Sequence, residues 1–263
     1  MNRLLFILKF LNHILWAKGR HGLHSPFVYD LVENVIQPDD GPTDEDKIEL
    51  LRSELLKVND LIELRDLGAG STMNSLKKRQ INSIAKNSLK SPKLARLLFR
   101  ISNRFKPEFL LELGTSFGIT SMYLSEGTST KKFITIEGDP MVAKIAKDNF
   151  LKLNYKNIEL VEGNFDELMS STLKKFPRID LAFVDGNHRK IPTLSYFEQL
   201  LKSVDKKTIL IFDDIHWSKE MEEAWEIIKR NEGVTITIDL FFIGLVFFHE
   251  NQAKENFRIR FLP

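Results

Sequence analysis

Three acidic side chains stand at the ends of two apolar runs in the second half of the chain. Asp185 ends the run IDLAFVDG (179–186), and Asp213 and Asp214 end the run TILIFDD (208–214). If these runs are neighbouring parallel strands, their carboxyl ends share one edge of a sheet and the three carboxylates converge there. Bare carboxylates at close range repel one another, and a divalent ion such as Mg²⁺, which prefers oxygen ligands, removes the repulsion. The pattern therefore predicts a metal site, unless Asp213 and Asp214 instead cap the helix that follows.

A histidine follows the first of these acids closely. His188 comes three residues after Asp185, and a histidine that titrates near neutral pH can take a proton from an acceptor hydroxyl. His188 is therefore the first candidate for a general base, and a structural loop histidine is the alternative. His216, just past the second run, is another candidate. His21 and His24 lie far from these motifs in the sequence, and we expect no chemical role for them.

Two glycine-containing loops compete as the place where a nucleotide-type cofactor binds: LRDLGAGS (64–71) and LLELGTSFGIT (110–120). Such a site needs a buried strand, a glycine turn that lets the backbone approach the ligand, and a second strand. The second strand ends, about twenty residues after the glycine turn, in an acidic residue that binds the ribose hydroxyls. The second loop meets all three conditions, with Gly114 and Gly118 in the turn and Glu137 at the end of KFITIEGD. The first loop is followed by a basic helical pattern with no strand and no acid.

The glycine spacing also selects among cofactors. Gly114 and Gly118 form GxxxG, whereas the pyrophosphate of a dinucleotide requires the tighter approach of GxGxxG. A cofactor without phosphate groups does not need that approach. The loop therefore favours S-adenosylmethionine over NAD.

The order of apolar runs from residue 109 onward predicts an α/β fold. Short β-rich runs alternate with helical patterns, which is typical of βαβ units and a parallel sheet. Two later runs, VTITIDL and FFIGLVFF, leave no room for a crossover helix between them and must pair antiparallel. The expected parallel strands are FLLELG (109–114), KFITIEGD (132–139), IELVEGN (158–164), IDLAFVDG (179–186) and TILIFDD (208–214).

The motifs ELGTSFGIT, FITIEGDP, LVEGN, IDLAFVDGNH and LIFDDI, in this order, resemble those of class I S-adenosylmethionine-dependent methyltransferases. Residues 106–250 are most similar to the catechol and caffeoyl-CoA O-methyltransferase type. The resemblance implies a Rossmann-like, doubly wound, seven-stranded sheet whose last two strands form an antiparallel hairpin. It also implies a methyltransferase domain (106–263) that binds S-adenosylmethionine. Before it lies a mainly helical N-terminal extension (1–105), which we expect to act as a substrate lid or a dimerisation element.

The resemblance assigns roles to the cofactor loop and to two later motifs. Glu112 would organise the methionine end of the cofactor, and Glu137 would bind both ribose hydroxyls. The segment Gly163-Asn164-Phe165 matches the family's adenine-side segment, where Phe165 would stack on the ring; a core role for Phe165 is the alternative. The cofactor-binding candidates are Glu112, Gly114, Thr115, Ser116, Gly118, Glu137, Asn164, Phe165 and Asp185.

The resemblance bears on the metal and the base as well. The family holds a divalent metal on Asp, Asp and Asn, and this chain has Asp185, Asp213 and Asp214 at those places, one charge more. The family's proton acceptor is a lysine where this chain has His188, so the catalytic candidates are His188 and Asp185. In metal-free relatives, acids at these positions bind the methionine amine, which is an alternative to a metal site.

The N-terminus predicts an amphipathic helix over residues 1–16. Leu4, Leu8, Leu11 and Leu15 recur at helical spacing, with Asn2, Lys9 and His13 on the other side. We expect the leucine face to pack on this protein or on a second copy in a homodimer; contact with a membrane surface is the alternative. No cleavage signal or membrane-spanning run is present, and the chain has no cysteine, which fits a cytoplasmic protein.

A basic stretch precedes the predicted α/β domain. Residues 72–107 contain ten Lys or Arg and no acid, and part of the stretch is the expected helix SPKLARLLFRISNRF. It indicates either a solvated helix face or attraction for an anionic substrate, a phosphate or a nucleic acid. RDLGAGS, just before it, is either a turn between two helices or a lid over the cofactor.

Together these motifs predict an S-adenosylmethionine-dependent O-methyltransferase that acts on a small molecule, with an anionic acceptor left open. A nucleic-acid methyltransferase is an alternative, although the motif VDGN differs from the Asn/Asp-Pro-Pro-aromatic set used on exocyclic amines, and no cysteine exists for attack on cytosine. A non-catalytic binding protein with this fold is a third reading. An NAD oxidoreductase is disfavoured by the glycine spacing.

Overall fold

The computed structural model describes residues 3–19, 22–38, 46–65, 76–250 and 252–262. The chain forms two compact units. One comprises residues 40–172, and the other joins residues 1–39 to residues 173–262. The predicted division into an extension (1–105) and a methyltransferase domain (106–263) follows sequence motifs rather than contacts, and it stays a prediction.

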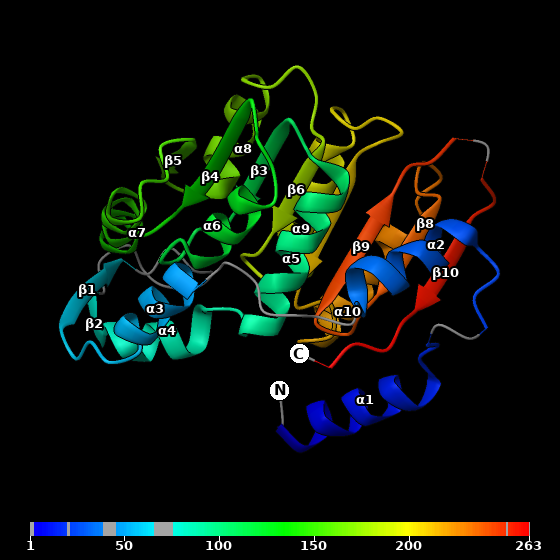
Figure 1. Cartoon of the computed structure of the whole chain (residues 1–263), viewed down its shortest axis with the longest axis horizontal. Coiled ribbons are helices and arrows are strands. Elements are labelled where there is room, and N and C mark those ends of the chain that lie inside the picture. Colours follow the sequence, from blue (N-terminus) through cyan, green and yellow to red (C-terminus); the bar gives the residue numbers. More distant parts are fainter. Residues whose placement is uncertain (1–2, 20–21, 39–45, 66–75, 251, 263) are drawn as a thin grey trace. The chain divides into compact units, whose positions relative to one another are not determined.

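The unit of residues 40–172 contains three parallel strands, helices and a separate strand pair (Figure 1). The parallel strands run in the order β3-β4-β5. The elements in chain order are α3 (Asp46–Leu55), β1 (Leu61–Arg65), β2 (Leu76–Gln80), α4 (Ile81–Ser88), α5 (Pro92–Phe105), β3 (Phe109–Leu113), α6 (Ile119–Glu126), β4 (Lys132–Glu137), α7 (Pro140–Lys152), β5 (Ile158–Glu162) and α8 (Phe165–Leu173).

Two helices of this unit begin where the sequence indicates. Ser91 caps α5 by accepting a hydrogen bond from the amide of Leu94 at 3.2 Å, with Pro92 at the first helical position. Asp139 caps α7 by accepting from two amides at 2.9 and 3.0 Å, again with a proline next. The Asp139 cap fixes the point at which the chain leaves β4 and enters α7.

An antiparallel strand pair, β1 and β2, occupies a region where the sequence showed no convincing strand. Leu61 pairs with Gln80 and Arg65 with Leu76, and Figure 1 shows the pair at the edge of this unit. The sequence LKKRQ of β2 hides the strand because it is almost entirely polar. One basic residue of the stretch is accounted for here, since Lys78 lies opposite Glu63 and forms an ion pair at 3.2 Å. The proposed lid, residues 66–71, lies outside the described residues.

The core of this unit joins the strand pair to the helices. Ile62 of β1 is buried together with side chains from α3, α4, α5, α6 and α7. This packing supports α6 and α7, the helices that follow β3 and β4. The buried cluster consists of Ile48, Leu51, Leu55, Ile62, Ile81, Ala85, Ala95, Phe117, Ile119, Met122, Tyr123, Val142, Ala146 and Phe150.

The other unit contains five strands in the order β10-β8-β9-β7-β6. β6 and β7 are parallel, whereas β9 is antiparallel to β7 and β8, which confirms the predicted terminal hairpin. Its elements are α1 (Arg3–Trp16), α2 (Pro26–Leu31), the π-helical turn η1 (Val32–Ile36), β6 (Leu181–Val184), α9 (Lys190–Leu200), β7 (Ile209–Asp213), α10 (Lys219–Arg230), β8 (Ile236–Asp239), β9 (Ile243–Phe247) and β10 (Glu255–Arg258).

The sheet has eight strands among the described residues, one more than the seven expected. The additional strand is β10, which pairs in parallel with β8. It is four residues long and only Phe257 of it is buried, so its sequence ENFR carries too little apolar pattern to predict a strand. The chain is thus mixed α/β, with a mostly parallel sheet that ends in an antiparallel hairpin and one extra edge strand.

Helix α1 forms as predicted, but the face that packs is not the predicted one. The leucine stripe is exposed: Leu4, Leu8, Leu11 and Leu15 have exposed fractions of 62, 53, 56 and 75%. The expectation that this stripe packs on the described part of the same chain is therefore wrong. Packing on a second copy or on a membrane surface stays a prediction. None of the described helices combines the length and apolar character needed to cross a bilayer.

The packed face of α1 is aromatic and contains a histidine. The rings of Phe6, Phe10 and His13 lie 5.1, 5.0 and 5.4 Å from the ring of Phe241. His13, assigned to the polar side from the sequence, is 3% exposed. Helical spacing correctly divides α1 into two faces, but it does not say which face is buried. The choice depends on the partner surface around Phe241, which packs against the aromatic rings of α1.

Substituting Gly244 by alanine is expected to destabilise the terminal hairpin. A Cβ there would lie 2.5 Å from Cη2 of Trp225, a side chain that is 1% exposed. Overpacking of this kind costs about 1–3 kcal/mol of unfolding free energy, which denaturant titration measures. Gly233→Ala is the control, since the described heavy atom nearest to its added Cβ is Oδ1 of Asn231, at 3.3 Å. Equal stability of the two variants would show that Trp225 can move aside.

Candidate functional site

The loop between β3 and α6 makes a tight turn with three residues in the left-handed region. Gly114, Ser116 and Gly118 have φ values of 100°, 49° and 82°. The amide of Gly114 donates to the carbonyl oxygen of Ile136 at 2.9 Å, which ties the start of the loop to β4. Positive φ favours glycine, so the two glycines of the GxxxG motif stand where the backbone requires them.

Gly118 also stands where no side chain fits. A Cβ there would lie 2.4 Å from Cε1 of Phe150, which α7 holds in the core of this unit. The main chain at the start of α6 is therefore in close contact with α7.

Glu137 reaches the middle of this loop from the end of β4. Its Oε2 accepts a hydrogen bond from the amide of Ser116 at 2.8 Å, and its Oε1 accepts from the amide of Asp139 at 3.0 Å. Burial raises the pKa of the Glu137 carboxyl, and the hydrogen bonds from Asp139 and Ser116 oppose that rise. The structure thus places this carboxylate against the predicted cofactor loop, with the acceptor character that a vicinal diol needs.

Glu112 lies beneath the loop and is completely buried. Its Oε2 accepts from the hydroxyl of Thr135 at 2.7 Å and from the hydroxyl of Ser121. The hydroxyls of Thr115 and Thr135 are 2.6 Å apart, and because Thr135 donates to Glu112, Thr115 is the donor to Thr135. This network joins β3, β4, the loop and α6, so it fixes the shape of the loop from below.

Thr135 and Ser121 were missed from the sequence. The register supplies a signal that could have found Thr135, because it pairs with Glu112 across β3 and β4. Ser121 lies nine residues after Glu112, within α6, and only the turn of the loop brings them together. Both belong with the predicted set as residues that position the loop.

The other predicted cofactor residues lie around the same loop and at the end of β5. The hydroxyl of Ser116 is 2.7 Å from that of Ser88 at the end of α4. Oδ1 of Asn164 accepts from the amide of Asp166 at 2.9 Å, which starts α8. The amide of Gly163 donates to the carbonyl oxygen of Glu137 at 2.9 Å. Phe165 is half-buried, so its ring is not a core side chain.

The predicted acidic cluster forms in the other unit, where His188 stands among the acids. Nε2 of His188 is 3.6 Å from Oδ1 of Asp185, and its Nδ1 is 3.9 Å from Oδ2 of Asp214. Asp185 directly follows β6, and Asp213 ends β7. The backbone of Asp214 is left-handed, with φ 54°, and its amide donates to Phe242 at 2.7 Å. The two strand ends therefore bring the acids together as the parallel pairing predicted.

One ligand-atom set in this cluster fits a divalent ion. Asp185, His188 and Asp213 each offer an atom, and these atoms lie within 4.8 Å of one another. The set contains His188 in place of Asp214 of the predicted trio. The donors are two carboxylate oxygens and one imidazole nitrogen, which suit a borderline or hard divalent cation. Because a nitrogen bound to a metal cannot also take a proton, His188 has one of these two roles at a time.

Two sequence alternatives are corrected here. Asp213 and Asp214 do not cap the following helix, because Ser218 caps α10 by accepting from the amide of Met221 at 3.1 Å. His216 is not placed as a general base: its Nε2 lies 2.8 Å from Asp239 and its ring stacks on Phe241 at 5.0 Å. His24 is exposed, and His21 lies outside the described residues.

The fold resembles that of known methyltransferases. A mostly parallel sheet with a terminal antiparallel hairpin, and a glycine loop after β3, is a fold that this chain shares with solved O-methyltransferases. Residues 111–215 match the family model of a methyltransferase domain. This part of the chain is therefore similar to a methyltransferase domain.

The curated proteins with related sequences carry different names. An uncharacterized protein, R132 of Acanthamoeba polyphaga mimivirus, is 27% identical over 49% of this chain and 63% of that protein. The O-methyltransferase imqG of Aspergillus flavus is 28% identical over 40% of this chain and 44% of that protein. The release factor glutamine methyltransferase of Buchnera aphidicola is 24% identical over 82% of this chain and 83% of that protein. The chain thus spans less than two thirds of the first two relatives.

Solved structures with this fold include O-methyltransferases. The O-methyltransferase from Bacillus cereus, in complex with S-adenosylhomocysteine, matches 84% of this chain and 97% of its own, with TM-score 0.54 and 20% identity. A candidate caffeoyl-CoA O-methyltransferase from Staphylococcus aureus matches 61% of this chain and 85% of its own, with TM-score 0.54 and 16% identity. At this identity the likeness establishes the fold.

Proposed function

We propose that this protein transfers a methyl group from S-adenosylmethionine to an oxygen of a small-molecule acceptor. The observation that carries the proposal is the contact between the Glu137 carboxylate and the amide of Ser116 at 2.8 Å. It joins an acid at a strand end to a glycine turn, which are the two parts that a nucleoside-type cofactor requires. S-adenosylmethionine, when bound, supplies a methyl group that its sulfonium already makes electrophilic.

The residues of the loop would hold that cofactor in a fixed orientation. Glu137 would accept from the ribose hydroxyls, and the backbone of Gly114, Thr115 and Ser116 would border the methionine part. The Glu112 network would keep this backbone rigid, since its carboxylate binds hydroxyls from both β4 and α6. A rigid loop serves the reaction because methyl transfer depends on alignment of donor and acceptor.

His188 would take the proton from the acceptor hydroxyl. Its side chain is 31% exposed, which leaves the ring accessible, and carboxylates lie 3.6 and 3.9 Å from its two nitrogens. These carboxylates would stabilise the imidazolium that forms when the proton arrives. Asp185 would act with His188 by orienting the ring.

The acidic cluster offers a second way to activate the acceptor. Asp185 and Asp213, with either His188 or Asp214, would hold a divalent ion such as Mg²⁺. The ion, when bound, would lower the pKa of a coordinated acceptor oxygen. Under this alternative the proton leaves from a more acidic hydroxyl, and His188 is a ligand rather than the base.

The class of acceptor is inferred from the charge of the chain. The basic stretch around α5 supports an anionic small molecule, and a nucleic-acid or protein acceptor remains the alternative. A homodimer through the exposed leucine face of α1 and a cytoplasmic location also stay predictions.

Calorimetric titration with S-adenosylhomocysteine, with and without Mg²⁺, tests the proposal. We expect binding in both conditions, and a change in heat or affinity on adding Mg²⁺ if the acidic cluster holds the ion. A screen of catechol-like and anionic acceptors, read by formation of S-adenosylhomocysteine, then identifies the acceptor. Absence of any cofactor binding by the folded protein would favour the non-catalytic reading.

Replacing His188 with glutamine separates chemistry from cofactor binding. We expect methyl transfer to the acceptor found in the screen to fall about 10²–10⁴-fold, the usual contribution of a general base. Affinity for S-adenosylhomocysteine should stay unchanged, because the described partners of His188 are Asp185 and Asp214. His24→Gln, an exposed loop variant, is the matched control. Unchanged turnover in His188→Gln would remove this residue from the reaction.

A further inference from the structure

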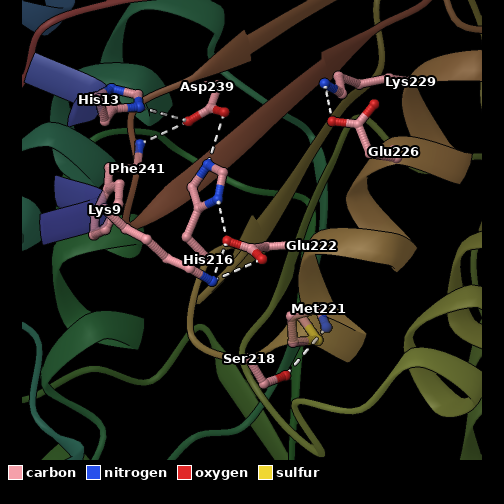
Figure 2. Close-up of polar contacts among 10 residues, drawn as sticks. All are labelled: Lys9, His13, His216, Ser218, Met221, Glu222, Glu226, Lys229, Asp239 and Phe241. Carbon is pink, nitrogen blue, oxygen red and sulfur yellow. Dashed lines mark hydrogen bonds and ion pairs between the residues drawn. The ribbon is translucent and has the colours of Figure 1, made fainter. Parts of the chain in front are cut away.

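A second cluster of metal-ligand side chains lies away from the residues assigned above. It consists of His13 from α1, His216 from the segment between β7 and α10, and Asp239 at the end of β8. One ligand atom of each lies within 4.8 Å of the others. Figure 2 shows the two histidine rings on either side of the Asp239 carboxylate. The side chains are 3, 17 and 8% exposed, so the cluster is largely shielded from water.

The outward-facing nitrogen of each histidine has an acceptor that fixes its orientation. Nε2 of His13 lies 3.3 Å from the carbonyl oxygen of Ile259, to which it donates. Nδ1 of His216 lies 3.4 Å from Oε1 of Glu222, and Lys9 holds that carboxylate at 2.7 and 2.8 Å (Figure 2). Carboxylates and backbone carbonyls in this position are the usual partners behind histidines that bind metals.

The inward-facing nitrogens meet a carboxylate. Nδ1 of His13 is buried without a hydrogen-bond partner among the described residues, and it lies 3.5 Å from Oδ1 of Asp239. Nε2 of His216 lies 2.8 Å from Oδ2 of the same side chain. Since Nε2 of His13 donates to Ile259, its Nδ1 is a lone pair that faces an acceptor oxygen. A cation between them would turn this unfavourable pairing into two bonds.

Burial supports the same arrangement. Burial lowers the pKa of His13, despite the nearby Asp239, and keeps the ring neutral. Burial raises the pKa of Asp239, but the neighbouring His216 and His13 and the amide of Phe241 together lower it, which keeps the carboxylate ionised. Neutral imidazole and ionised carboxylate are the forms in which these side chains bind metals.

We propose that His13, His216 and Asp239 form a binding site for a divalent transition metal of the zinc class. Two imidazole nitrogens and one carboxylate oxygen are a common three-ligand set for such an ion, with a fourth position open to water. Bonds of about 2.0–2.2 Å in a tetrahedron place ligand atoms about 3.4 Å apart. Nδ1 of His13 and Oδ1 of Asp239, 3.5 Å apart, already meet that spacing. Nε2 of His216, 2.8 Å from Oδ2 of Asp239, would move outward to bind the same ion.

The site would connect three separate parts of one unit. The metal would tie α1 to the end of β8 and to the segment that leads into α10, through residues 13, 239 and 216. Its expected effect is therefore on stability and on the docking of α1, in contrast to the acidic cluster around His188, whose expected effect is on methyl transfer.

The test measures metal binding by the full chain in an Asp185→Asn background, which removes the other ligand set. Protein stripped with chelator is titrated with Co²⁺ and Zn²⁺, and bound metal is counted after dialysis. We expect one equivalent of metal, with the visible ligand-field bands of tetrahedral Co²⁺, and a rise in melting temperature. His13→Gln should lower the affinity by about 100-fold or more, and Glu222→Gln by about 10–100-fold, the usual cost of losing an outer partner.

His249→Gln is the matched control. This histidine is half-buried, and burial lowers its pKa, but it lies against Phe27 and Phe247 outside the cluster. The affinity of the His249→Gln variant for Co²⁺ should equal that of the parent protein. If His13→Gln fails to fold, Glu222→Gln carries the test, because it keeps all three ligands. No binding to the parent, or equal binding in His13→Gln and His249→Gln, would overturn the proposal whether or not the protein methylates anything.

Discussion

Replacing Gly118 with valine is expected to abolish binding of S-adenosylhomocysteine and to destabilise the unit of residues 40–172. The residue has φ 82°, where a non-glycine residue costs about 1–2 kcal/mol. Its Cβ would also lie 2.4 Å from Phe150, which is only 4% exposed and cannot swing into solvent. The two costs add, so the unfolding free energy should fall by about 3 kcal/mol or more.

A pair of variants separates the two costs. In Gly118→Ala combined with Phe150→Leu the collision is relieved, and the interaction energy of the double-mutant cycle reports its size. The remaining loss reports the backbone strain. Gly19→Ala is the control, since nothing lies within 4 Å of the added Cβ. Cofactor affinity in Gly118→Val equal to that of Gly19→Ala would show that the turn does not border the ligand.

Replacing Glu137 with glutamine is expected to weaken binding of S-adenosylhomocysteine about 100-fold. Hydrogen bonds to a charged group contribute about 1.5–3 kcal/mol each, and glutamine offers the diol one neutral acceptor in place of an ionised carboxylate. Glu162→Gln is the matched control, because Glu162 ends the neighbouring strand β5 in register with Glu137 but is exposed. Calorimetry measures both variants, and equal affinities would remove Glu137 from the cofactor site.

The affinity should also depend on pH in a defined direction. Burial raises the pKa of Glu137 above its ordinary value of 4.5, so the carboxyl takes up a proton at a higher pH than an exposed glutamate does. Protonation removes the charge that accepts from the diol, and the affinity should therefore fall as the pH decreases through this raised pKa. The free protein should gain stability from this one group over the same range, since the folded state binds the proton more tightly. The affinity of Glu137→Gln should lack this pH dependence.

The sequence predicted the parts of the fold that carry regular patterns. The parallel strands β3, β4, β6 and β7 read as apolar runs because they are buried, and caps such as Asp139 mark where helices begin. The cofactor loop could be chosen because the strand, the turn and the acid follow one another at fixed spacing. The close approach of His188 to Asp185 also follows from local sequence, since three residues separate them.

The parts that were missed depend on contacts between distant residues. β2 and β10 are polar or short, and they become strands only because β1 and β8 lie beside them. The side of α1 that is buried depends on Phe241, which comes more than two hundred residues later. The cluster of His13, His216 and Asp239 likewise unites residues whose separations in sequence form no recognised motif.

The pairing of the two ends of one unit has a consequence for biosynthesis. Lys18 bridges to Ile259, and its amide donates to the carbonyl of Arg258 at 2.8 Å. The partners of α1 therefore leave the ribosome last, after the continuous segment 40–172 has emerged and had time to fold. Until then the aromatic side of the nascent helix is uncovered, as its leucine side still is in the folded chain.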